Sequence, residues 1–157
     1  MTSTKRLLAM LRRRFRFSEG QVPHDADDML HEVGKPQEAL LYSLLFVPEL
    51  CAVDGSVLLL NGSGNRQRQF LEAKAKDQMP LDRLEASFNS VEIPFLFLDQ
   101  DFGDGEEMLI AEKIAEAWRR ALVTLYPDRR LVVNIVPAQD NAGNITVECF
   151  ESRTDLK

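Results

Sequence analysis

The sequence has few cysteines and no long apolar run. Its 157 residues include only Cys51 and Cys149, too few for a disulfide framework. No stretch approaches the roughly 20 consecutive apolar residues that span a bilayer, and the N-terminal segment lacks the apolar core of a secretory signal. We therefore expect a cytoplasmic protein in a reducing environment, without a membrane span.

Motifs that carry catalysis or bind cofactors are also missing. The sequence contains no G-x-S-x-G elbow, no phosphate-binding G-x-x-x-x-G-K-[ST] loop and no H-E-x-x-H zinc motif, and these are the patterns that place nucleophiles, phosphates and zinc ions. Both cysteines lie in apolar, strand-like runs, where a free thiol packs as a small hydrophobic group. The sequence thus predicts no catalytic residue and no cofactor.

The net charge of −6 conceals an uneven distribution of charge. Residues 1–20 contain six basic residues and one acidic residue, a net charge of +5, whereas residues 21–157 contain 13 basic and 24 acidic residues, a net charge of −11. A sharp asymmetry of this kind indicates a separate element. We predict a basic amphipathic helix or arm over residues 1–20 and a single domain over residues 21–157.

The basic segment has one apolar face. The spacing over residues 4–16 predicts a helix whose stripe consists of Leu7, Leu8, Leu11 and Phe15. A helix of this kind can lie on an anionic membrane, in a groove of a partner or against nucleic-acid phosphates. The acidic remainder of the chain offers an intramolecular alternative. We favour docking on that acidic body, or a free arm, and expect neither a membrane nor a nucleic acid as partner.

Two hairpins, one single strand and several helices are predicted in the rest of the chain. Asp54-Gly55 between two apolar runs is typical of a type I′ turn. The period of 3.6 residues predicts one long helix over residues 105–126, whose apolar face includes Trp118 and Leu125. Shorter helices are predicted over 25–33, 36–46 and 65–77 and after Pro80, and strands over 49–53, 56–60, 91–98, 131–136 and 144–150.

Strands grouped in hairpins are typical of the α+β class. We predict about five strands, two hairpins plus one strand, in an antiparallel or mixed sheet packed by the long helix and several short ones. The single strand 91–98 is apolar on both faces beyond Ile93, which indicates burial, although Pro94 cannot donate to a ladder. It would pair in parallel with 131–136 if the two strands are neighbours.

The acidic segment 99–107 is the main candidate site. It has no basic residue, and carboxylate oxygens are the ligands that calcium and magnesium prefer, so Asp99, Asp101 and Asp104 are candidate metal ligands. The EF-hand pattern fails, however, because its glycine and final glutamate are missing. An acidic loop over an aromatic residue also suits a basic protein partner. The predicted partner-binding residues are Asp99, Asp101, Phe102, Asp104 and Glu106.

Two further segments have a pattern that suits ligands. His24, Asp28 and His31 would share one face of a helix, and imidazole and carboxylate groups are reasonable transition-metal ligands. Asn61–Asn65 is a glycine-rich turn before a helix, where backbone N–H groups can hold phosphate. We favour ordinary turns in both places, because the first helix is short and the second lacks the full glycine pattern.

These observations predict a small acidic protein-binding module of the adaptor, inhibitor or immunity type, without a cofactor, whose partner is another protein. A basic protein would suit its acidic segment. The first alternative is a divalent-metal-dependent hydrolase or other enzyme that uses the acidic segment 99–107. The second is a structural module that forms homo-oligomers through the strand 95–98 or the final hairpin. Size and charge alone do not choose among these.

Overall fold

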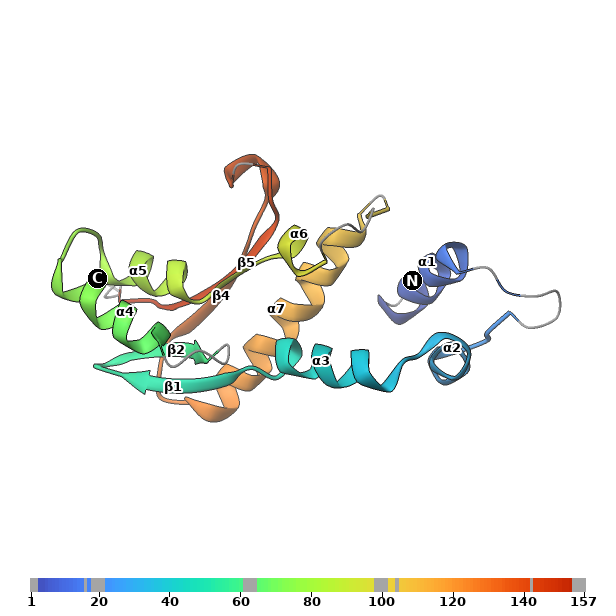
Figure 1. Ribbon diagram of the computed structural model, residues 1–157, viewed down its shortest axis with the longest axis horizontal. Coiled ribbons are helices and arrows are strands. Elements are labelled where there is room, and N and C mark those ends of the chain that lie inside the picture. Colours follow the sequence, from blue (N-terminus) through green and yellow to red (C-terminus); the bar gives the residue numbers. More distant parts are fainter. Residues whose placement is uncertain are drawn as a thin grey trace. The chain divides into compact units, whose positions relative to one another are not determined.

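The computed structural model describes residues 3–15, 17, 22–60, 65–97, 102–103, 105–141 and 143–153 (Figure 1). The chain divides into two compact units, Met1–Tyr42 and Ser43–Lys157. This division falls inside one continuous helix, α3 (Pro36–Phe46). The predicted separation of residues 1–20 from the rest of the chain stays a prediction.

The first unit is helical. It contains α1 (Ser3–Arg14), α2 (Ala26–Val33) and the first two turns of α3. The N-terminus of α2 is capped by Asp25, whose side chain accepts a hydrogen bond from the backbone N–H of Asp28 at 3.0 Å. The helix ends at Val33, as predicted, and Gly34 is its C-cap residue.

The second unit contains the predicted first hairpin. Strands β1 (Glu49–Val53) and β2 (Ser56–Leu60) pair in antiparallel register, with Val53 opposite Ser56. The turn between them has φ of 48° at Asp54 and 82° at Gly55. Positive φ at both central residues is what a two-residue turn needs to match the twist of its strands, so this prediction is confirmed.

The other strands form a second sheet. Its order is β3 (Ser90–Glu92), β5 (Thr146–Glu151) and β4 (Leu131–Val136), and both pairings are antiparallel. Because β5 lies between β3 and β4, these two strands do not pair in parallel. A short 3₁₀ turn, Ala138–Asp140, lies between β4 and β5. The described strands therefore confirm the α+β class, and they divide between two sheets.

The predicted buried strand over 91–98 is wrong beyond Glu92. The chain turns there into a short helix, α6 (Ile93–Leu96), with Pro94 in its first turn. Proline suits that position because its missing N–H has no partner in a first turn and its fixed φ is already helical. Ile93 is fully buried, but Phe95 is 66% exposed and Leu96 39% exposed. An apolar run that suggests a buried strand thus places two large side chains on the surface.

The long helix α7 (Glu106–Leu125) packs against β4 and β5. Its predicted face is buried as far as Leu122, whereas Leu125 is exposed. The Trp118 indole N–H donates to the carbonyl of Leu45 at 2.8 Å, which attaches the end of α3 to α7. A second, smaller core lies between β2, α4 (Asn65–Ala75) and α5 (Leu81–Phe88), and its buried residues are Leu58, Phe70 and Leu84.

One asparagine joins the two sheets. The side chain of Asn89 donates to the carbonyl of Val57 at 2.8 Å and accepts from the N–H of Leu59 at 2.9 Å, so it binds the free edge of β2. Its own carbonyl accepts from the N–H of Cys149 in β5 at 3.0 Å. Asn89 is 1% exposed. Its side-chain amide pairs with one backbone donor and one backbone acceptor of β2, and so takes the place of a neighbouring strand at these two groups.

We predict that Asn89→Ala destabilises the protein by roughly 2–5 kcal/mol, because it leaves the Val57 carbonyl and the Leu59 N–H buried without a partner. Urea unfolding followed by circular dichroism measures this change. The control is Asn134→Ala, which alters an exposed residue of β4 and is expected to stay within about 0.5 kcal/mol of the original protein. Equal effects of the two substitutions would contradict the bridging role of Asn89.

Candidate functional site

The acidic segment is described only in part. Asp99, Asp101 and Asp104 lie outside the described residues, so their predicted roles as metal ligands or partner contacts stay predictions. Phe102 is half-buried and packs edge-on against Phe97, with ring centroids 6.0 Å apart. The Glu106 carboxylate accepts from the backbone N–H of Gly103 at 2.6 Å. Phe102 and Glu106 therefore make contacts within the chain.

The exposed apolar side chains near this segment belong to α6. Phe95 and Leu96 immediately precede Phe97, which packs against the main core. Sequence reasoning missed this pair because it placed both residues in a buried strand. Pro94 was the available signal, since proline suits the first turn of a helix better than a paired strand. An exposed aromatic residue thus lies four residues before Asp99 in the sequence.

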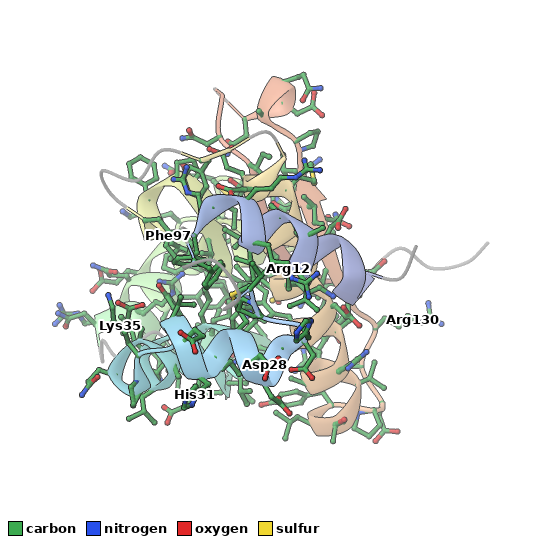
Figure 2. All side chains as sticks on the ribbon, turned by 90° about the vertical axis from the view of Figure 1, so that its right-hand side faces the viewer. Arg12, Asp28, His31, Lys35, Phe97 and Arg130 are labelled. Atoms are coloured by element: carbon green, nitrogen blue, oxygen red, sulfur yellow. The ribbon has the colours of Figure 1, made fainter. Side chains whose placement is uncertain are left out.

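The three side chains of His24, Asp28 and His31 do not share a helix face, which the disfavoured metal-site interpretation would require. Helix α2 begins at Ala26, so His24 precedes it. The Asp28 carboxylate accepts from the backbone N–H of His24 at 3.0 Å, which is a turn contact. Figure 2 shows Asp28 and His31 as exposed side chains of α2. Across the described ranges, no three His, Cys, Asp or Glu side chains gather closely enough to hold a metal ion.

Arg12 attaches α1 to the segment that leads into α2. Its guanidinium donates to the carbonyl of Pro23 at 2.7 Å and to that of His24 at 2.5 Å (Figure 2). The sequence of the first unit carries seven basic and six acidic residues, so it is almost neutral, whereas the second unit carries 12 basic and 19 acidic residues. The positive charge of α1 is therefore largely matched by acidic residues of its own unit, notably those of α2. Docking of α1 on the rest of the chain stays a prediction.

The glycine-rich turn before α4 is outside the described residues except for Asn65, which begins the helix. The next residue, Arg66, is half-buried, and burial lowers the pKa of its guanidinium. Its Nε atom is buried without a hydrogen-bond partner among the described residues. Arg66 is therefore a partly desolvated cation in the first turn of α4. The phosphate-binding interpretation stays a prediction.

The two cysteines differ in their surroundings. Cys149 is 1% exposed, and burial, with the nearby charges of Glu85 and Glu148, raises the pKa of its thiol to about 12. A thiol with so high a pKa is a poor nucleophile, because the thiolate is the reactive form. The buried-thiol prediction is confirmed for Cys149. Cys51 is half-buried, and its Sγ atom accepts from the side-chain amide of Gln67 at 3.3 Å.

A buried ion pair escaped the sequence analysis. Glu85 of α5 is 1% exposed, and Arg153 binds both of its carboxylate oxygens, at 2.9 and 2.6 Å. The backbone N–H of Glu151 donates to the same carboxylate at 2.9 Å. Glu151 and Arg153 lie 66 and 68 residues after Glu85 in the sequence, so no local pattern could have predicted these contacts. A carboxylate that is 1% exposed and accepts three hydrogen bonds within the chain has a structural role.

A second arginine extends this network. Arg129 forms an ion pair with Glu151 and donates to the carbonyl of Gly55 in the β1–β2 turn. Burial alone would raise the pKa of Glu85. Hydrogen bonds from Arg153 and from the Glu151 backbone outweigh burial, together with the charge of Arg153, and leave the pKa below its ordinary value. The network joins α5, the end of β5 and the first hairpin.

Comparison of the chain with protein-family models, with curated proteins and with solved structures finds no match. None of the described helices is both long and apolar enough to cross a bilayer. The candidate site therefore depends on the chain's own surface, where apolar exposure and charge are the available indicators.

The Glu85 network predicts that acid weakens the fold. A carboxyl group whose pKa is lower in the folded state gives stability that is present above its unfolded pKa, near 4.5, and is lost as the pH falls through the folded value. Unfolding free energies measured between about pH 7 and pH 3 test this dependence. In the Glu85→Gln variant, the part of the loss of unfolding free energy at low pH that comes from this carboxyl group should be absent.

At neutral pH, Arg153→Ala should cost about 3 kcal/mol, because it removes the only ion-pair partner that the described residues provide for the buried Glu85 carboxylate. Arg130→Ala is the control, since the Arg130 side chain is exposed (Figure 2). A slope of stability against pH that is identical in the original protein and in Glu85→Gln would contradict the assigned pKa direction.

Proposed function

We propose that the protein is a small acidic protein-binding module, of the adaptor, inhibitor or immunity type, that takes a basic protein as its partner without a cofactor. The observation that carries this proposal is the exposure of Phe95 and Leu96 on α6, directly before the segment 99–107 with its five acids and no basic residue. Exposed aromatic anchors beside charged residues are the usual anatomy of a protein interface.

The parts of this surface have different roles in the proposal. Phe95 is the anchor, because a large exposed ring gains most from burial against a partner. Asp99, Asp101 and Asp104 supply the negative charge that attracts a basic surface and sets the rate of encounter. Phe102 contacts the Phe97 ring and Glu106 accepts from the Gly103 N–H, so we expect their effect on binding to be indirect.

Capture from a native cell extract tests this proposal. The full chain is immobilised in its original form and as Phe95→Ser, with Val123→Ser as the control because Val123 is 70% exposed on α7. We expect basic proteins that elute with moderate salt, a loss of about tenfold or more with Phe95→Ser, and no loss with the control.

Neutralising the charge provides an independent readout. Replacing Asp99, Asp101 and Asp104 together by asparagine should weaken capture at low salt and flatten its dependence on salt, because fewer charges remain to be screened. Capture that is the same for the original chain and for Phe95→Ser would contradict the proposal. So would capture that salt does not affect.

A further inference from the structure

Strand β4 is an edge of the three-stranded sheet and lacks the usual protection of an edge. It pairs with β5 on one side and with no described strand on the other. Edge strands are normally protected by a charged residue, a proline, a bulge or a covering element. Residues 131–136 contain no charged residue and no proline, and all of them pair with β5 in consecutive register without a bulge. Another strand could therefore pair with the free side of β4.

The backbone groups on the free side belong to alternate residues. The Ser152 N–H donates to the Arg130 carbonyl at 2.9 Å, so the even-numbered residues of β4 form the hydrogen-bonded pairs with β5. The Cys149 N–H, opposite Val133, binds the Asn89 carbonyl on the β3 side, which gives the same alternation. The residues whose N–H and C=O groups point away from β5 are therefore Leu131, Val133 and Ile135. Their N–H groups have no partner among the described residues.

One charged side chain reaches this edge from α7. The Arg119 guanidinium donates to the Val133 carbonyl at 2.8 Å, and it forms no ion pair with a described residue. Glu116, one turn earlier on α7, is instead bound by Lys113 and Arg120. A guanidinium has several N–H donors and a carbonyl has two lone pairs, so both groups have room for a second partner. The middle of the free edge thus carries a positive charge without a counter-ion in the described part of the chain.

We propose that an extended segment of a partner protein adds to β4 as a further strand of this sheet, and that a carboxylate of this segment pairs with Arg119. The alternating donors and acceptors of a sheet edge are matched by the backbone of another strand. The guanidinium favours an acidic segment, because it forms two parallel hydrogen bonds with a carboxylate. The backbone therefore supplies the affinity, and Arg119 supplies the selection by charge.

The charge of Arg119 argues against a second copy of this chain as the occupant. Antiparallel pairing of β4 with its own copy, centred on the strand, places Val133 beside the Val133 of that copy. Each Val133 carbonyl is bound by an Arg119, so two guanidiniums would meet in the middle of the interface. Like charges that face each other across paired strands are destabilising, whereas a segment with a carboxylate has complementary charge at the same point.

Peptide binding tests the selection by charge. The probe is a short capped peptide of alternating valine and threonine with a central glutamate, and the comparison probe has lysine at that position. Calorimetric titration of the full chain, up to about 1 mM peptide, measures both dissociation constants. We expect the glutamate peptide to bind at least tenfold more tightly than the lysine peptide. Arg119→Gln should remove this difference, whereas the matched control Arg120→Gln, whose arginine is bound to Glu116, should keep it.

The backbone amides test the geometry. With the glutamate peptide bound, hydrogen exchange followed by NMR should slow at Leu131, Val133 and Ile135, and stay unchanged at the even-numbered residues of β4, which already bind β5. N-methylation of alternate peptide residues provides a second readout. Methyl groups on the set of residues that faces β4 should abolish binding, and methyl groups on the other set should not, because only the first set donates to the edge.

Four results would overturn the proposal. They are the absence of binding up to about 1 mM glutamate peptide, equal affinity for the two peptides, protection that does not alternate along β4, and sedimentation of the chain as a dimer with these amides already protected. The last result would show that a second copy occupies the edge. Circular dichroism confirms that each variant is folded.

The inference goes beyond the proposed function, since it concerns another surface and a partner segment of opposite charge. Phe95→Ser alters α6 and should leave peptide binding unchanged, whereas Arg119→Gln should leave capture of basic proteins unchanged. Peptide binding without capture of basic proteins would contradict only the proposed function. Capture without peptide binding would contradict only the role of β4.

Discussion

The amide side chain of Asn89 is the contact on which the second unit depends. Within the described residues, the β1–β2 hairpin pairs with no third strand, and an isolated hairpin is marginal in water. Asn89 binds the free edge of β2 and, through its carbonyl, β5. Its N–H donates to the carbonyl of Glu85 at 2.8 Å. One end of α5 therefore carries both the amide bridge and the buried ion pair that attach the hairpin.

The surfaces proposed for binding are positioned by this arrangement. Strand β3 follows Asn89 directly, and Pro94 then turns the chain into α6, whose Ile93 is buried while Phe95 faces solvent. The Trp118 indole donates to the carbonyl of Leu45, near the end of α3. The exposed apolar residues of α6 therefore follow directly on the buried Ile93, and a rigidly held anchor loses little conformational entropy on binding.

Local patterns predicted the elements that local energetics decide. The Asp54-Gly55 turn and the buried face of α7 depend on neighbours a few residues apart. The run around Pro94 was misassigned because apolar side chains were taken as evidence of burial, while the proline set the backbone. Asn89 and Glu85 could not be identified, because their partners lie 30 to 68 residues away. Of the candidate site, the acidic segment was visible in the sequence, whereas its exposed anchor was not.

Hydrogen exchange at the Leu59 amide tests most directly whether Asn89 makes one cooperative unit of the two sheets. This N–H binds the Asn89 side chain, and the Cys149 N–H binds the Asn89 carbonyl. If the sheets open together, both amides exchange at the same slow rate, set by global unfolding. A Leu59 amide that exchanges orders of magnitude faster than that of Cys149 would show that the hairpin opens alone, and would contradict the account.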